Sequence, residues 1–225
     1  ILAWSGGILL KFAGDAMLVY FPHQAEKQQA SWAVRAGVRM LTAISKFSNI
    51  ETPLETISLK MKIGVATGEF LSASVGSRQR MEYAILGEAI SQTMGAESAA
   101  TGPGQLVINQ ATADCLDESF PLAEQAPGYC RIDLDTFADP DSYEIKAEKR
   151  RARGAISFDA SPEAILGLMQ DTLDQIHALR PYIAHELVER IIAQAQRRRF
   201  DSQFLLTTVM FCNFDGLEKL LDIWG

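Results

Sequence analysis

The feature that most constrains this chain is a pair of apolar runs near its start, separated by the dipeptide Gly14-Asp15. Residues 8–13 (ILLKFA) and 16–21 (AMLVYF) are strand-like, and a Gly-Asp pair between two such runs is typical of a tight hairpin turn. The sequence therefore predicts a β-hairpin over residues 8–21. Its turn exposes the carboxylate of Asp15, which either only makes the turn or also binds a divalent cation, because hard cations take oxygen ligands.

Composition and charge exclude several classes of function. The 225 residues include 21 basic and 28 acidic ones, for a net charge of −7, which argues against nonspecific binding to nucleic acid. The basic run at 197–199 ends a helical pattern, where it favours a helix C-terminus over a binding site. No apolar run reaches 18 residues, so no membrane span is expected.

The three cysteines and three histidines have no spacing typical of a metal site. Cys115, Cys130 and Cys212 lie far apart and are odd in number, which fits neither a zinc site nor a disulfide framework and favours a reducing cytoplasm. The histidines show no ligand spacing either: His23, His177 and His185.

The chain does not begin with Met but opens in an apolar stretch, and we expect it to be a piece of a longer protein.

After the hairpin, the hydrophobic pattern changes repeatedly between helical and strand periodicity. It predicts a helix over 23–47, a half-buried strand over 57–67, strands over 70–75 and 81–86 around a polar tip, and a helix from 87 to about 100. A strand over 105–108, a helix capped by Asn109 that runs to 116, and a closing pair of strands at 129–134 and 142–145 follow. This order predicts an α+β fold, with a sheet that helices cover on one side.

The C-terminal third is predicted to be mainly helical. Residues 146–154 form a basic linker, and Ser161 and Pro162 begin a helix as its cap and first residue. A second helix is expected over 181–199 and a strong strand over 204–211, with a turn at 215–216 and the start of a further helix after it.

Four motifs, in the same order as in the family, resemble the catalytic domain of class III nucleotidyl cyclases. KFAGDA at 11–16 resembles the family's second metal-binding segment, and MKIGVATG at 61–68 its strand and turn with "IG…TG". YAILGEAI at 83–90 resembles its strand-to-helix junction, and GPGQLVI at 102–108 the strand that follows. The resemblance covers about residues 6–116 and is strongest to the soluble, tandem type of adenylyl cyclase.

The resemblance implies a ferredoxin-like cyclase fold with a mixed, largely antiparallel sheet. It also implies conversion of a nucleoside triphosphate, with ATP favoured, to the 3′,5′-cyclic monophosphate and pyrophosphate, with two divalent cations (Mg²⁺ or Mn²⁺). By the same resemblance Asp15 is the second metal-binding aspartate. The residues expected to contact the nucleotide are Lys11, Phe12, Gly14, Lys62 and Arg78, with Arg80 as a weaker candidate. Each basic residue among them has the alternative of a solvated surface charge.

The chain also departs from the family's pattern. Ser91 and Gly95 occupy the places of the Asn and Arg that stabilise the transition state in relatives. Residues 207–217 resemble the opening strand of another cyclase domain, with Asn213 in the place of the first metal-binding Asp, although a last strand of a single domain is the alternative. We therefore expect a first cyclase half without its opening strand at 1–146, a helical linker at 147–203 and the start of a second, divergent half at 204–225.

Two functions remain open from the sequence. The first is a cytoplasmic adenylyl cyclase for cyclic nucleotide signalling, in which the partner of this half is the second half of the same chain. On this hypothesis the 225-residue chain alone is expected to be inactive. The second is a catalytically inactive, cyclase-like sensor or scaffold, which the residues at 91 and 95 favour.

Overall fold

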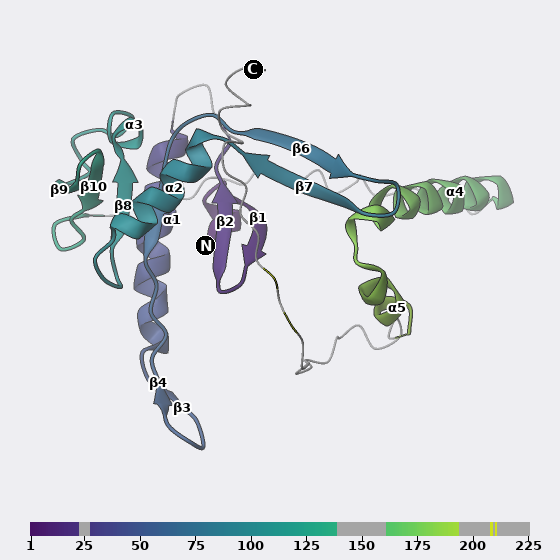
Figure 1. The fold of residues 1–225 in the computed structure, drawn as a ribbon, viewed down its shortest axis with the longest axis horizontal. Helices are drawn as coiled ribbons and strands as arrows, with labels where there is room; N and C mark the ends of the chain where they lie inside the picture. Colours follow the sequence, from purple (N-terminus) through teal and green to yellow (C-terminus); the bar gives the residue numbers. More distant parts are fainter. Residues whose placement is uncertain (23–27, 139–160, 194–207, 209, 211–225) are drawn as a thin grey trace. The chain divides into compact units, whose positions relative to one another are not determined.

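A computed structural model describes residues 1–22, 28–138, 161–193, 208 and 210 of the chain (Figure 1). The chain divides into two units, which are described separately. Unit 1 comprises Ile1–Phe70 and Glu88–Gly154, and unit 2 comprises Leu71–Gly87 and Ala155–Gly225. None of the helices in the described part of the chain has the length and apolar character needed to cross a membrane.

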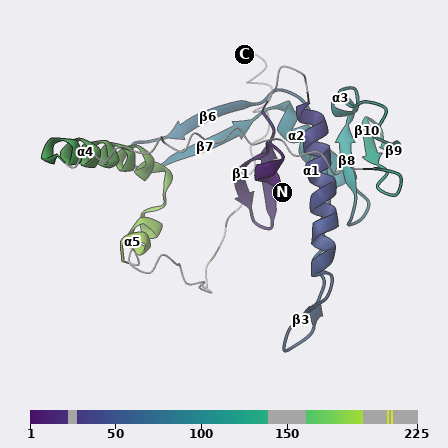
Figure 2. The ribbon, with the colours of Figure 1, turned by 180° about the vertical axis from the view of Figure 1, so that it is seen from behind.

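The predicted hairpin is confirmed at the start of unit 1. A short 3-10 helix, Leu2–Trp4, precedes β1 (Ile8–Ala13), which pairs antiparallel with β2 (Ala16–Tyr20). Ala13 pairs with Ala16, so the turn consists only of Gly14 and Asp15, and the register shifts between Leu9 and Lys11. β1 and β2 form a separate two-stranded sheet, which Figure 2 shows from behind.

The largest sheet of unit 1 has four strands in the order β5-β8-β10-β9. They are β5 (Ile63–Val65), β8 (Leu106–Asn109), β9 (Leu122–Ala126) and β10 (Tyr129–Ile132). β5 and β8 are parallel, whereas β10 is antiparallel to both of its neighbours. With the helices that pack on it, this sheet confirms the predicted α+β class.

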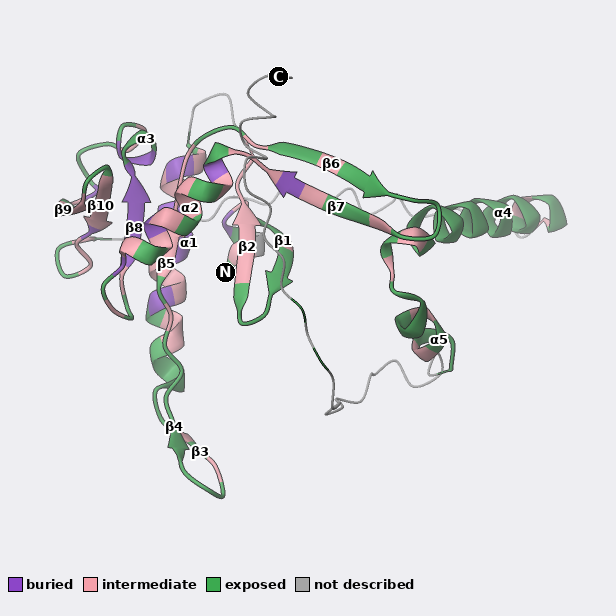
Figure 3. Cartoon of the chain, in the orientation of Figure 1, coloured by how far each residue is buried: buried purple, intermediate pink, exposed green. Residues whose placement is uncertain are grey.

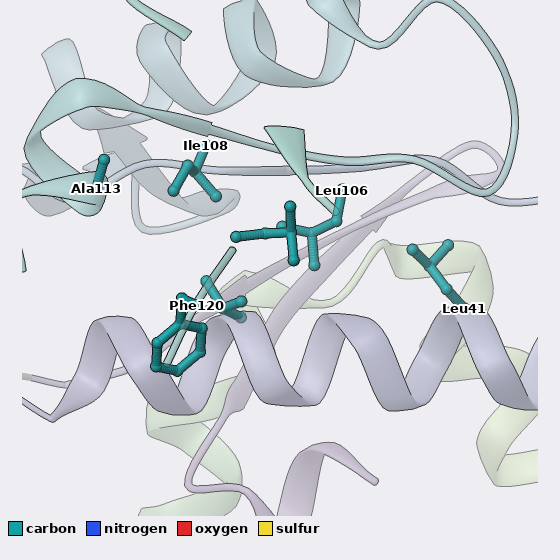
Figure 4. Packing of buried hydrophobic residues seen from close by; sticks show 7 residues of the cluster. Leu41, Leu106, Ile108, Ala113 and Phe120 are labelled. Carbon is teal, nitrogen blue, oxygen red and sulfur yellow. The ribbon is translucent and has the colours of Figure 1, made fainter. Parts of the chain in front are cut away.

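Helices cover β8 on both faces, so the expectation of a sheet covered on one side is wrong. Leu106 and Ile108 belong to the cluster that contains Val34 of α1 (Gln29–Ile44), whereas Val107 packs with Ala96 of α2 (Glu88–Ala99). All four residues of β8 are buried (Figure 3), and Figure 4 shows Leu106 and Ile108 within the hydrophobic cluster. The physical reason lies in the sequence itself, because LVI is a continuous apolar run, and such a run is typical of a strand buried on both faces.

The helix predicted over 23–47 is confirmed in its main part. α1 begins at Gln29, and a 3-10 turn, Ser45–Phe47, continues it, while residues 23–27 lie outside the described part. Gly37 lets α1 approach the sheet closely, because a Cβ atom at this position would overlap Cδ1 of Leu106.

The single strand predicted over 57–67 is wrong. Thr56–Ile57 forms β4, which pairs only with β3 (Ile50–Glu51) in a small separate hairpin, and β5 begins later, at Ile63. The amide of Gly104 donates to the carbonyl of Met61, and the amide of Ile63 donates to that of Gln105. The strand starts there because its partner β8 begins only at Leu106, which an alternating pattern in one segment cannot reveal.

The closing pair of strands differs from the expected one. β10 matches the predicted strand at 129–134, but its hairpin partner is β9, which the sequence analysis did not predict. The other predicted partner, 142–145, lies outside the described residues. The helix capped by Asn109 is confirmed but short, since α3 comprises Gln110–Ala113 and its cap accepts a hydrogen bond from the Thr112 amide.

A buried arginine lies at the edge of the core of unit 1. The Arg35 guanidinium carbon is 4.7 Å from the centre of the Phe120 ring and 5.6 Å from that of Phe137, so the charge lies over two neighbouring aromatic rings. Hydrogen bonds from Ser119 lower the pKa of the Asp117 carboxyl below its ordinary value, and the positive charge of Arg35 acts in the same direction.

Unit 2 contains the hairpin of β6 (Leu71–Gly76) and β7 (Met81–Leu86) and two helices. α4 (Pro162–Leu179) begins as predicted, with the Ser161 hydroxyl accepting from the Ala164 amide at 3.3 Å. The helix predicted from 181 begins later, as α5 (His185–Ala193), because Pro181 lies in the 3-10 turn Arg180–Tyr182 and Ile183 is extended. The predicted strand at 204–211 and the helix end at 194–199 fall outside the described residues, apart from 208 and 210.

Candidate functional site

The turn of the β1–β2 hairpin presents Asp15 to solvent. Gly14 has φ of 65°, in the left-handed region that a residue with a side chain rarely adopts, so glycine suits this turn. Residues 11–16 are all exposed. The sequence therefore produces an accessible carboxylate within a tight backbone turn.

Three other predicted site residues lie on the same hairpin. Lys11 pairs with Leu18 and Phe12 with Met17, so they occupy successive positions of β1 and point to opposite faces. The Phe12 side chain is 67% exposed, which is unusual for phenylalanine and leaves its ring available to a ligand or a partner surface. Lys11, Phe12, Gly14 and Asp15 are thus brought together by local structure alone.

A divalent cation fits Asp15 only as one ligand of a larger set. The exposed carboxylate has the right chemistry, because Mg²⁺ and Mn²⁺ prefer oxygen ligands. Among the described residues, however, no group of three or more His, Cys, Asp or Glu side chains comes together. The described residues supply one carboxylate that could bind a cation and no complete cation site.

Lys62 lies outside the hairpin, immediately before β5. Its Nζ atom is 3.0 Å from Oε1 of Glu97 on α2, and both side chains are about half exposed. In the part of the chain that the structure describes, the hairpin sheet shares no strand pairing with the sheet that contains β5. Strand pairing therefore does not place Lys62 beside Lys11 and Asp15, and its role as a nucleotide-binding residue stays a prediction.

Arg78 belongs to unit 2, in the turn between β6 and β7. The Ser77 hydroxyl accepts hydrogen bonds from the amides of Gln79 and Arg80, which orders this turn. Arg80 is paired with Glu82 at 3.2 Å on the same hairpin. Both arginines are exposed, as expected for the tip of a polar hairpin.

A buried polar cluster joins the carboxyl ends of the parallel strands β5 and β8. Oδ1 of Asn109 accepts from the Thr112 amide at 3.0 Å, from the Thr112 hydroxyl at 2.7 Å and from the Thr67 amide at 3.2 Å. The two threonine hydroxyls are 3.0 Å apart. Asn109 was predicted as a helix cap, but its link to Thr67 spans 42 residues and has no signal in the sequence.

The segment that follows Thr67 also contacts the start of α2. The Ala89 amide donates to the Glu69 carbonyl at 3.3 Å, and a Cβ atom on Gly68 would lie 3.3 Å from that of Ala89. The carboxyl edge of parallel strands is where α/β sheets commonly bind ligands. The "TG" turn and the helix start that the motifs identified are therefore one connected structure.

The positions of Ser91 and Gly95 on α2 offer no cationic group. Ser91 is exposed, and Gly95 faces Tyr129 so closely that a Cβ atom would overlap the tyrosine hydroxyl. That hydroxyl donates to Oε1 of Gln92 at 3.2 Å. A side chain as large as arginine cannot be accommodated at position 95 without displacing Tyr129.

Comparison with known proteins gives a consistent family. The sequence model of the family described as "Adenylate and Guanylate cyclase catalytic domain" matches residues 8–132. A terminal-differentiation specific adenylate cyclase of Dictyostelium discoideum is 31% identical over 124 residues, which cover 52% of this chain and 5% of that protein. Adenylate cyclase type 10 of Oryctolagus cuniculus is 20% identical over 213 residues, which cover 92% of this chain and 13% of that protein.

Solved structures agree on the fold. The crystal structure of the guanylyl cyclase Cya2 is similar with a TM-score of 0.51 and 27% sequence identity, over 63% of this chain and 76% of that one. The chain spans only a small part of the curated relatives that it matches.

Proposed function

The chain belongs to the adenylate and guanylate cyclase catalytic domain family, and from that premise we propose that it is the cation-binding half of an adenylyl cyclase. In this proposal the half acts with a second cyclase half of the same protein, across a cleft that the two halves form together. The domain limits we propose are those expected from the sequence, namely 1–146, 147–203 and 204–225.

The proposed reaction is an intramolecular phosphoryl transfer. The ribose 3′-oxygen forms a bond to the α-phosphorus and loses its proton, while the bond from the α-phosphorus to the oxygen that bridges it to the β-phosphorus breaks. Pyrophosphate leaves with that bridging oxygen and its electron pair. Divalent cations, when bound, neutralise phosphate charge and favour deprotonation of the attacking hydroxyl. Asp15 would serve as one of their ligands, and Lys11, Lys62 and Arg78 would bind phosphate oxygens.

The observation that carries this proposal is the exposed carboxylate of Asp15 at the two-residue hairpin turn, inside the region that matches the family. A carboxylate in this place has no hydrogen-bond or ion-pair partner among the contacts described, and it contributes no packing to the core. Phe12 and Gly14 would then contact the nucleotide from the same hairpin.

ATP is the substrate that the relatives favour. Both curated relatives described above are adenylate cyclases by name, although the similar crystal structure is that of a guanylyl cyclase. Recognition of the base is assigned in this proposal to the second half. The protein would act in cyclic nucleotide signalling in the cytoplasm.

Tyr129 fills the space beside Gly95, and this supports the proposal that the two halves supply different catalytic groups. Since Ser91 and Gly95 offer no guanidinium, the groups that stabilise the transition state would come from the second half. The 225-residue chain alone would then produce no cyclic nucleotide. The same observation favours a second candidate function, a catalytically inactive cyclase-like sensor or scaffold.

Replacement of Asp15 by Asn in the full-length protein tests the proposal. Asn makes the same turn but lacks the charge, so the melting temperature should stay the same. Loss of several kcal/mol of charge stabilisation should lower cyclic AMP production about a hundredfold or more, measured with saturating Mg²⁺ or Mn²⁺.

Asp171→Asn, which removes an exposed carboxylate on α4, is the matched control and should leave activity unchanged. Near-normal turnover of the Asp15→Asn protein would contradict the metal-binding role. No cyclic nucleotide from the unsubstituted full-length protein would favour the sensor or scaffold instead.

A further inference from the structure

Lys62 is held by a carboxylate that the family motifs do not explain. Its Nζ atom is 3.0 Å from Oε1 of Glu97, and the two residues are 35 positions apart in the chain. By contrast, the Arg80–Glu82 ion pair and the His185–Glu189 contact join residues within one hairpin or one helix. The Lys62–Glu97 pair connects the segment before β5 to the last turns of α2.

Close packing holds α2 against β5 beside this pair. A Cβ atom on Gly64 would overlap the Glu97 amide nitrogen and the Thr93 carbonyl oxygen, so glycine lets the backbone of α2 lie directly against β5. The Lys62 side chain and the Cβ position of Gly64 both face α2, as the Lys62–Glu97 contact and the Gly64 packing show. The side chains are nevertheless 39% and 43% exposed, so a ligand from solvent can reach the ammonium group.

A carboxylate and a phosphate compete for the same lysine. An ammonium group has three donors, of which Glu97 takes one, and the negative charge of Glu97 offsets part of the attraction that Lys62 exerts on another anion. An exposed ion pair of this kind contributes little to stability, so stability alone does not explain why the carboxylate is there.

We propose that Glu97 is a positioning residue that acts through Lys62: it holds the ammonium group in place and sets how tightly that group binds the phosphates of the nucleotide. The inference rests on the proposed function, because it takes Lys62 to be a phosphate-binding residue. The inference assigns to Glu97, on α2, a role in limiting the affinity for the triphosphate. Because Glu97 is negatively charged, its effect should be larger for ligands that carry more negative charge.

The test replaces Glu97 by Gln, which keeps the shape of the side chain and an oxygen acceptor but removes the charge. The full-length protein is titrated with ATP, ADP and adenosine, each displacing a fluorescent ATP analogue. We expect ATP to bind about threefold to tenfold more tightly, ADP to gain less, and adenosine to be unchanged, because only the phosphates meet the altered charge. Glu189→Gln, which removes an exposed carboxylate that contacts His185 on α5, is the control and should change none of the three affinities.

The same titrations in a Lys62→Ala background separate the possible causes. Lys62→Ala alone should weaken ATP binding, and adding Glu97→Gln should then change it by less than about twofold, since Glu97 acts through the lysine. A persistent gain in that background would mean direct repulsion by Glu97 and would overturn the inference. So would equal changes for ATP and adenosine, or no change for either.

The outcomes also separate this inference from the proposed function. If Lys62→Ala weakens ATP binding but Glu97→Gln has no effect, the inference fails and the phosphate-binding role of Lys62 stands. If Lys62→Ala leaves ATP affinity unchanged, both the inference and that role fail, while the Asp15→Asn result remains an independent test. A full-length protein that binds none of the ligands would overturn both proposals.

Discussion

β1 and β8 are similarly apolar in sequence, yet their surroundings in unit 1 are opposite. β8 is buried along its whole length between α1 and α2, whereas five of the six residues of β1 are exposed. Ile8, Leu9 and Phe12 are 44%, 43% and 67% exposed. Four of the proposed functional residues lie on this exposed strand and its turn. The hydrophobicity of a segment therefore does not distinguish the buried core strands of this domain from the strand that carries the proposed site.

The largest expected effect comes from breaking the scaffold at Gly64. In Gly64→Ala the new methyl group meets backbone atoms of α2 at Thr93 and Glu97, and backbone cannot rotate away as a side chain can. We expect the free energy of unfolding to fall by about 3 kcal/mol, measured by urea denaturation of the chain. Gly102→Ala is the control, since no atom lies within 4 Å of its Cβ position, and an equal loss in both proteins would refute the packing argument.

A smaller loss is expected at Gly95, where the obstacle is a side chain. Gly95→Ala gains helix propensity but must displace the Tyr129 hydroxyl from its hydrogen bond to Gln92, for a net loss of about 1 kcal/mol. In a Tyr129→Phe background the same substitution should cost less, because the obstructing oxygen is absent and the nearest remaining atom, Cζ of the ring, is 3.1 Å from the Cβ position.

Gly167→Ala supplies the reference for helix propensity alone. Gly167 lies within α4 and its Cβ position is open, so this substitution should raise helicity and stability by about 0.5–1 kcal/mol. Failure of Tyr129→Phe to rescue Gly95→Ala would show that something other than the hydroxyl fills the space.

The smallest change in stability is expected on the exposed hairpin. Phe12→Ser removes a large apolar side chain, but one that is already two-thirds exposed, so the chain should lose less than about 1 kcal/mol in the same denaturation experiment. A loss of about 3–5 kcal/mol, as for a core phenylalanine, would mean that the hairpin is as tightly packed as β8 and would remove the contrast between them.

Local patterns predicted the elements whose determinants are local. The β1–β2 hairpin follows from a Gly-Asp turn between apolar runs, and the start of α4 follows from Ser161 and Pro162. The strand predicted over 57–67 failed because its alternation begins well before the residues that have a partner strand, which start at Ile63. β9 was missed because Leu122–Ala126 includes Glu124 and Gln125, which weaken the apolar pattern.

The candidate site was predictable only in part, for a related reason. Motifs identified Lys11, Asp15 and Lys62, but not that Lys62 is paired with Glu97, since that contact depends on how β5 and α2 pack. Tyr129 of β10 fills the space beside Gly95 of α2, and the sequence of either segment alone does not predict this contact. Contacts between distant residues need the tertiary structure, because no local pattern encodes them.

The hydrogen bond from the Ala89 amide to the Glu69 carbonyl has a further consequence for how this domain can change. The chain leaves unit 1 after Phe70 and returns at Glu88, and this bond holds the exit and the return side by side. Segments with adjacent ends accept insertions and deletions at little entropic cost. The arm formed by 71–87 can therefore lengthen, shorten or be exchanged during evolution while the sheet and helices of unit 1 keep their connections.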